Sequence, residues 1–154
     1  NISLVHLNLS GNRVSTDGVL ALSRSMQSNT TLTHLNLSHC DMNDRAAEHL
    51  SNGIKNNKSL LSLGVAHCNI SSSGMDSLCY GCLVNKSLRE LDLRGNGFDK
   101  EGALALVTAL KDHKSLVRVD VGNNVRMGAD GITVMAQSLK SNFLISKLVM
   151  TRKK

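Results

Sequence analysis

The sequence predicts an α/β solenoid, a horseshoe in which a parallel sheet lines the concave face and helices cover the convex face. Three observations lead to this prediction. One motif recurs at a spacing of 28 residues, and each copy joins a strand pattern to a helix pattern. The 154-residue chain also has two Phe, one Tyr and no Trp, so its core must consist of many small, similar layers.

The repeat divides the chain into five full units and the strand of a sixth. The predicted units are residues 4–31, 32–59, 60–87, 88–115 and 116–144, with a partial unit at 145–154. The fifth unit is one residue longer than the others. Because the chain starts without Met and inside a repeat, whereas terminal repeats normally carry polar caps, we expect a single domain, 1–154, that is a fragment of a longer protein.

Each predicted unit opens with a strand and continues with a helix. In the first strand Leu7 and Leu9 alternate with polar residues, so they point into the core. The helices carry apolar residues four positions apart, which form one core-facing stripe. These pairs are Leu22 and Met26, Leu50 and Ile54, Leu78 and Cys82, Leu106 and Leu110, and Met135 and Leu139. Small residues recur beside this stripe and allow neighbouring helices to approach closely; they are Ser25, Gly53, Gly81, Ala109 and Ser138.

The pattern Leu-x-x-Leu-x-Leu-x-x-(Asn/Cys), followed by a helix, resembles the ribonuclease-inhibitor class of leucine-rich repeats over essentially the whole chain. This resemblance implies strands on the inside of a horseshoe and helices on the outside. Known members include the ribonuclease inhibitor, the sensor ends of NOD-like receptors, the GTPase activator of Ran, tropomodulin-type actin cappers and axonemal scaffold subunits. The resemblance therefore predicts a fold but leaves several functions open.

The ninth position of each unit is predicted to form a structural ladder. Its residues are Asn12, Cys40, Cys68, Asn96 and Asn124. The chain turns out of the strand at this position, and a buried Asn side chain can bond the backbone groups that the turn leaves unpaired. Cys fills the same space as a small, weakly polar residue, and the resembled family uses both residue types.

The cysteines are interpreted as buried structural thiols, and no metal or cofactor is expected. Cys79 and Cys82 form a C-x-x-C sequence, but Cys82 falls in the core column of the helices, so we do not expect redox activity from this pair. A zinc site formed by His39-Cys40 and His67-Cys68 is disfavoured, because each ladder Cys should point inward while each His faces the surface. Free, buried thiols favour a reducing compartment.

The outward-facing strand positions form the candidate partner-binding site. The third unit is almost bare, and the following units carry mixed charges that could fix the register of a partner. The predicted contact residues are Ser62, Gly64, Ala66, Glu90, Asp92, Arg94, Arg118 and Asp120. In the alternative interpretation these charges simply pair with each other on a solvated sheet.

Several other function classes are disfavoured by the sequence. The net charge of +6 is spread along the chain, and Lys58, Lys86 and Lys114 lack accompanying aromatic residues or Arg forks, so nucleic-acid binding is not expected. No stretch is long and apolar enough to cross a membrane. No catalytic motif appears. The N-x-(Ser/Thr) sequons follow from the repeat itself and do not indicate secretion.

The sequence thus predicts a non-enzymatic scaffold that binds a protein partner on its concave face, in the cytoplasm. A cytoskeletal or ciliary location remains open. Two alternatives are a Ran-type GTPase activator and the ligand-sensing end of a NOD-like receptor. The resemblance permits both, although a receptor would need a nucleotide-binding domain upstream of Asn1.

Overall fold

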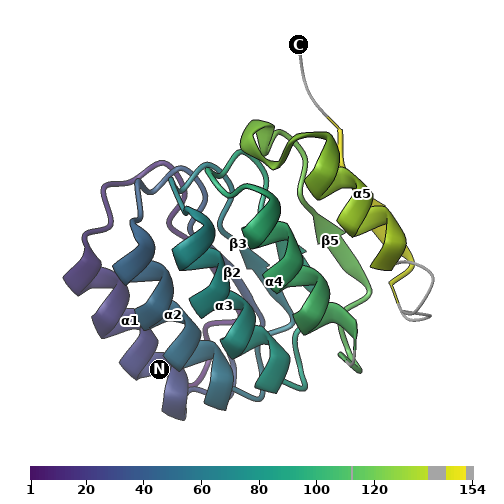
Figure 1. The fold of residues 1–154 in the computed structure, drawn as a ribbon. Helices are drawn as coiled ribbons and strands as arrows, with labels where there is room; N and C mark the ends of the chain where they lie inside the picture. Colours follow the sequence, from purple (N-terminus) through teal and green to yellow (C-terminus); the bar gives the residue numbers. More distant parts are fainter. Residues whose placement is uncertain (112, 139–144, 152–154) are drawn as a thin grey trace.

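The computed structural model describes residues 1–111, 113–138 and 145–151 as a stack of strand–helix units (Figure 1). The elements are β1 (His6–Asn8), α1 (Thr16–Ser28), β2 (His34–Asn36), α2 (Asp44–Asn56), β3 (Ser62–Gly64), α3 (Ser72–Val84), β4 (Glu90–Asp92), α4 (Lys100–Lys111), β5 (Arg118–Asp120), the 3-10 helix η1 (Val125–Met127), α5 (Gly128–Ser138) and β6 (Lys147–Val149). The predicted α/β solenoid is confirmed. None of the described helices is both long and apolar enough to cross a membrane.

The strands form one parallel sheet in the order β1-β2-β3-β4-β5-β6. Leu7 pairs with Leu35, and Leu35 with Leu63, so each residue lies beside its equivalent in the next unit. Parallel neighbours require a crossover connection, and the helix of each unit supplies it. All the helices lie on one side of the sheet, which leaves the other side open (Figure 1).

The core fills the space between the sheet and the helices. Leu35, Leu63 and Leu91 stack in the strands and are at most 2% exposed. Most of the predicted helix stripe is buried, but Leu22 is only half-buried because no described unit precedes it. Leu139 of the predicted stripe lies outside the described residues. The helices bury a further column that the four-residue spacing does not indicate, namely Val19, Ala47, Met75 and Ala103.

Polar side chains spaced 28 residues apart begin the helices. The Ser15 hydroxyl accepts a hydrogen bond from Gly18 N at 3.2 Å. The Asn43 side chain accepts one from Ala46 N at 2.9 Å. Each such bond satisfies a backbone N–H that has no partner inside the helix, so these N-caps fix where α1 and α2 start.

A second polar column, absent from the sequence-based predictions, lies between each helix and the next strand. It consists of Asn29, Asn57, Asn85 and His113. The Asn85 side chain donates to the carbonyls of Ile54 and Asn57, both at 2.8 Å. Its oxygen accepts from Ser87 N and Leu88 N at 2.8 and 2.7 Å. This buried amide therefore satisfies its own turn and also ties that turn to the preceding unit.

His113 takes the place of Asn in the fourth unit. Its ring is 4% exposed, and Nε2 lies 2.9 Å from the Cys82 carbonyl. Nδ1 accepts from Ser115 N and Leu116 N at 3.2 and 3.0 Å, so the proton resides on Nε2. Burial lowers the pKa of His113 below its ordinary value, and the nearby Lys86 charge lowers it further, against the opposing effect of the Cys82 hydrogen bond. The turn thus depends on a neutral imidazole.

Candidate functional site

The open face of the sheet is hollowed, and every residue predicted to contact a partner lines the hollow. Its volume is about 640 Å³. The predicted residues that line it are Ser62, Gly64, Ala66, Glu90, Asp92, Arg94, Arg118 and Asp120. His, Asn and Ser side chains of β1, β2 and the turns after them also contribute to the lining. We call this surface the concave hollow.

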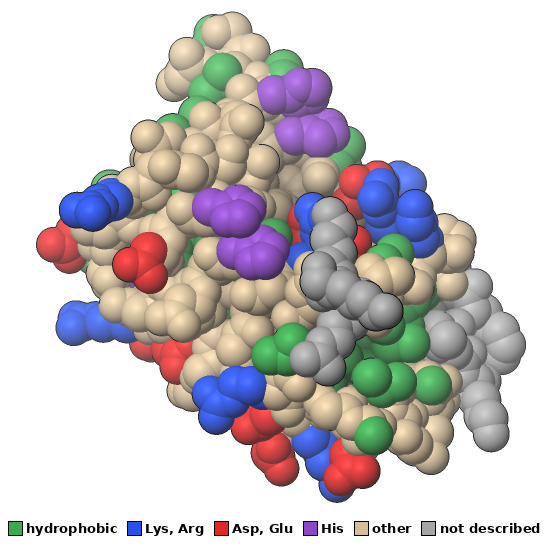
Figure 2. Space-filling view, turned by 90° about the horizontal axis from the view of Figure 1, so that it is seen from above, with side chains coloured by type: hydrophobic (Ala, Val, Ile, Leu, Met, Phe, Trp, Pro, Cys, Tyr) green, Lys and Arg blue, Asp and Glu red, His purple; other side chains and the backbone are tan. Residues whose placement is uncertain are grey.

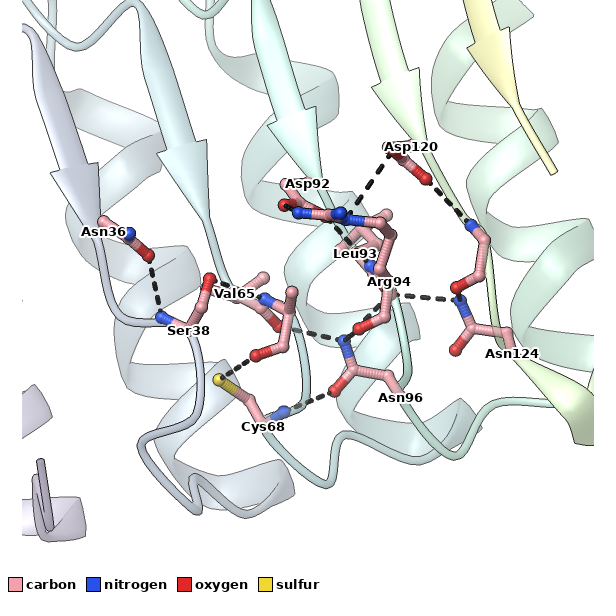
Figure 3. Close-up of polar contacts among 12 residues, drawn as sticks. Asn36, Ser38, Val65, Cys68, Asp92, Leu93, Arg94, Asn96, Asp120 and Asn124 are labelled. Carbon is pink, nitrogen blue, oxygen red and sulfur yellow. Dashed lines mark hydrogen bonds and ion pairs between the residues drawn. The ribbon is translucent and has the colours of Figure 1, made fainter. Parts of the chain in front are cut away.

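One outward column of the sheet has a structural role at the strand ends. The side chains of Asn8, Asn36, Asp92 and Asp120 each accept a hydrogen bond from the backbone N–H two residues later, at 3.0 or 3.1 Å. These contacts form Asx turns, which lead the chain out of the sheet. Asp92 and Asp120 therefore stabilise their own turns, in addition to any contact they make with a partner (Figure 3).

The nearly bare strip predicted in the third unit is only partly accessible. A Cβ on Gly64 would lie 2.9 Å from the Asn36 side-chain oxygen, so the Asn36 side chain closely approaches this glycine. The Ser38 hydroxyl accepts the Ala66 N–H at 3.2 Å and replaces the missing Asx turn. Ala66 is 2% exposed, whereas Ser62 and Gly64 are half-buried. The strip offers a partner mainly Ser62 and the Gly64 backbone.

Three of the predicted charged residues pair with each other (Figure 3). Arg94 donates to Asp92 through Nη2 at 2.6 Å and through Nε at 2.9 Å. Arg94 Nε also lies 3.6 Å from an Asp120 carboxylate oxygen. Burial alone would raise the pKa of Asp92, but the hydrogen bonds and charge of Arg94 outweigh burial and hold that pKa below its ordinary value. These three residues form a pre-organised polar cluster.

Glu90 and Arg118 differ from that cluster because their charges are not paired. They lie side by side in the register of β4 and β5, and both are exposed. Within the described part of the chain, neither forms an ion pair. Glu90 and Arg118 are therefore the charged groups of the concave hollow that keep their full capacity for a partner.

Two pairs of histidines lie toward the neutral side of the open face, and three of these residues, His6, His34 and His39, line the concave hollow. The rings of His6 and His34 are 4.2 Å apart and meet edge to face, and those of His39 and His67 stack at 4.6 Å. Figure 2 shows these paired imidazoles on the surface. His39 and His67 have φ angles of 59° and 53°, a left-handed conformation that is uncommon outside Gly but that His, like Asn and Asp, adopts more often than most residues. Both histidines are exposed, whereas the ladder cysteines that follow them are buried.

Four of the five predicted ladder residues donate to backbone carbonyls of the preceding unit, just after its strand. Their contacts are Cys40 to Leu9, Cys68 to Leu37, Asn96 to Val65 and Asn124 to Leu93, at 2.9 to 3.2 Å. The Asn96 oxygen also accepts from Cys68 N and Ile70 N, at 3.0 and 3.2 Å. Asn12 is exposed, and among the described residues its side chain bonds within its own turn alone, to Leu9 and Ser10. The Asn124 side-chain oxygen is buried without a partner among the described residues.

All four thiols are buried, and burial raises the pKa of three of them. Burial raises the pKa of Cys68 to about 11 and that of Cys82 to about 12. It also raises the pKa of Cys79 well above its ordinary value. Since the thiolate is the reactive form, Cys79 and Cys82 are poorly suited to redox chemistry. No group of three or more metal-ligating side chains gathers in the described regions.

Comparison with known families adds sequence evidence to this geometry. The family model for the leucine-rich repeat matches residues 1–23, 28–51, 56–79 and 84–107, together more than half of the chain. The chain belongs to the leucine-rich repeat family. The fifth unit lies beyond the matched residues, but β5 and α5 continue the same strand–helix order. No curated protein sequence matches this leucine-rich repeat chain.

Two solved structures share the fold. The C-terminal domain of tropomodulin from Caenorhabditis elegans superposes with a TM-score of 0.76 at 18% identity, over 93% of this chain and 86% of that domain. Actin-binding site 2 of leiomodin-1 superposes with a TM-score of 0.73 at 15% identity, over 91% of this chain and 83% of that one. At these identities the similarity establishes the leucine-rich repeat fold.

Sequence reasoning missed the second polar column although a signal was present. The segments Asn57-Lys58-Ser59-Leu60, Asn85-Lys86-Ser87-Leu88 and His113-Lys114-Ser115-Leu116 recur at the repeat spacing. The first two contain sequons, yet the Asn57 and Asn85 side chains are 5% and 2% exposed and fully hydrogen-bonded. Recurrence of a turn residue at fixed spacing could have identified the column before the structure did.

Proposed function

We propose that the concave hollow binds a protein partner and that this leucine-rich repeat chain is an interaction scaffold and not an enzyme. The open hollow with unpaired Glu90 and Arg118 beside a pre-organised Asp92–Arg94–Asp120 cluster supports this function. Side chains on short, paired strands lose little conformational freedom on binding, so a partner can use them efficiently. The open sheet face of a solenoid is also a usual surface for docking of a polypeptide.

The similarity to leiomodin-1 supports a cytoskeletal partner, and actin is the first one to test. The structure of leiomodin-1 that shares this fold is an actin-binding site. We extend that property to this chain as a proposal because the two chains share the fold over most of their lengths. The four cysteines, free and buried, are consistent with work in a reducing compartment such as the cytoplasm.

Co-sedimentation with filamentous actin and pull-down with mass spectrometry test this function. The parent chain is compared with Glu90→Ser/Arg118→Ser, which removes the unpaired charges from the hollow. A matched control, Arg126→Ser/Asp130→Ser, removes one exposed cation and one exposed anion outside it. We expect the hollow variant to weaken partner binding about tenfold, or about 1.4 kcal/mol, and the control to leave it unchanged.

The identity of the captured protein separates the remaining functions. Ran, or another small GTPase, would favour the GTPase-activator alternative, and an immune ligand would favour the receptor alternative. Equal binding by all three forms of the chain would reject the concave hollow as the binding face.

A further inference from the structure

A repeated contact controls how closely the helices pack. The Ser51 hydroxyl of α2 donates to the Ser77 carbonyl of α3 at 2.6 Å, directly beside Gly81. A Cβ on Gly81 would lie 2.6 Å from the Ser51 carbonyl oxygen, so only Gly permits this approach. Ser23 and Gly53 form the same contact between α1 and α2. We call this contact the Ser–Gly clamp.

The Ser–Gly clamp is replaced at the border between α3 and α4. Cys79 and Ala109 occupy the positions that Ser51 and Gly81 hold one unit earlier. Cys79 donates no such bond among the described residues, and the Ala109 methyl group adds bulk where Gly81 has none. Consistent with this, fewer residues of α3 and α4 come close to one another than residues of α2 and α3 do.

A second hollow lies on the convex face, over these helices. Its volume is about 680 Å³, and α2, α3 and α4 lie side by side beneath it (Figure 1). Cys79 and Ala109 are among its most buried lining residues. Tyr80, Leu83 and Leu104 stand around it and are 55%, 40% and 53% exposed. We call this surface the convex hollow.

The charged residues that line the convex hollow are all acidic, and one cation lies beside it: Lys55 Nζ is 4.8 Å from the centre of the Tyr80 ring and 3.2 Å from its hydroxyl. Glu48, Asp76 and Glu101 line it from three helices, and no Lys or Arg is among its described lining residues. The chain as a whole carries +6, so this is a local reversal of the overall charge. Favourable interaction with a helix dipole accounts only for Glu101, because Glu48 and Asp76 lie beyond the first turns of their helices.

We propose that the convex hollow binds a basic, amphipathic helix of a partner protein. The apolar side of such a helix would cover Tyr80, Leu83 and Leu104, and its Lys or Arg side chains would meet the three carboxylates. This surface is separate from the concave hollow, so either proposal can fail without the other.

Fluorescence anisotropy with a labelled synthetic peptide tests the proposal. The probe is a helix of about 14 residues in which Leu recurs at helical spacing among Lys residues. Two control peptides replace either every Leu with Ser or every Lys with Glu. We expect the Leu/Lys peptide to bind the chain at least about tenfold more tightly than both controls. Equal binding of the Leu/Glu peptide would overturn the charge argument and with it the proposal.

Variants locate the peptide on the molecule. Tyr80→Ser/Leu104→Ser removes the apolar contacts, and Glu48→Gln/Asp76→Asn/Glu101→Gln removes the charges. Ile132→Ser in α5 is the matched control, an exposed apolar residue outside the convex hollow. We expect each hollow variant to weaken binding about tenfold and the control less than about twofold, with unfolding midpoints confirming that all are folded. Comparable loss in the control, or none in the hollow variants, would reject the site.

Phospholipid vesicles test whether the convex hollow binds a membrane surface instead of a peptide. Vesicles containing anionic phosphatidylserine should not bind, because the three carboxylates repel such a surface. Vesicle binding that depends on Leu104 would replace the peptide proposal with a membrane contact.

Discussion

Two helix–helix contacts come from the same repeat but pack differently: α2 against α3, which we call the tight border, and α3 against α4, which we call the loose border. Between the second and third units, Ser51 and Gly81 bring α2 and α3 into close contact. Between the third and fourth units, Cys79 and Ala109 take their places, and the turn after α4 uses His113 where Asn85 stood. A solenoid can therefore keep its sheet register while one border loosens, because each unit packs only against its neighbours.

Adding a methyl group at the tight border should have the largest effect on stability. The new Cβ of Gly81→Ala would meet backbone atoms of Ser51 that cannot move away without separating α2 from α3. We expect a loss of about 2–4 kcal/mol in the free energy of unfolding, measured by urea denaturation. The reverse change at the loose border, Ala109→Gly, should cost only about 1 kcal/mol through helix propensity. Similar losses for both variants would mean that the two borders do not differ.

Restoring the Ser–Gly clamp at the loose border is the sharper comparison. Cys79→Ser/Ala109→Gly should draw α4 toward α3, and we expect its stability to stay within about 1 kcal/mol of Ala109→Gly because the new hydroxyl gains a carbonyl partner. Because α4 would then lie closer to α3, the convex hollow should become narrower, and binding of the Leu/Lys peptide should weaken about tenfold in anisotropy measurements. Unchanged affinity would show that the convex hollow does not depend on these two residues.

His113 makes the loose border sensitive to pH. Its lowered pKa in the folded state means that folding favours the neutral ring, so its contribution is complete above the ordinary pKa of 6.5 and is lost as pH falls below that value. Protonation of Nδ1 would remove the acceptor for Ser115 N and Leu116 N. We expect His113→Asn to lose less stability than the parent between pH 7 and pH 5 in urea denaturation, with His34→Asn as an exposed control. Parallel loss in the parent and His113→Asn would contradict this role.

The smallest effects should come from the concave hollow. Glu90→Ser/Arg118→Ser should change the free energy of unfolding by less than about 0.5 kcal/mol, because these exposed charges are unpaired. Arg94→Ser should cost up to about 1 kcal/mol, since it breaks a half-exposed bidentate pair with Asp92. Thermal unfolding of both variants measures the difference. A greater loss for the Glu90/Arg118 variant would mean that those residues support the fold.

The repeat made most of the fold predictable. Leucine at fixed spacing predicted the sheet register and most of the helix stripe, and both agree with the structure. The buried column that contains Val19 and Met75 was not predicted, because the prediction used only apolar residues four positions apart. Each helix in fact presents a wider apolar face to the sheet. The polar column that contains Asn57 and Asn85 was not predicted, because these residues were interpreted as parts of glycosylation sequons. Their side chains are in fact buried and hydrogen-bond the backbone of the turns.

The candidate site was predictable only in outline. Strand alternation correctly placed Glu90 and Arg118 on the open face, where they line the concave hollow. Alternation gave no sign that Asp92 caps its own turn and pairs with Arg94, or that Ala66 is buried beneath the strand end. Those facts depend on where the chain leaves the sheet, which side-chain periodicity does not describe.

The sequence by itself determined the family, the order of strands and helices, and which side chains face the open sheet. It did so because a fixed period forces every unit into the same conformation. Only the tertiary structure decided which surface charges are paired, how closely neighbouring helices approach, and that a hollow opens beside Cys79 and Ala109. These properties depend on contacts between equivalent positions of successive units, where a single methyl group or hydroxyl changes the packing.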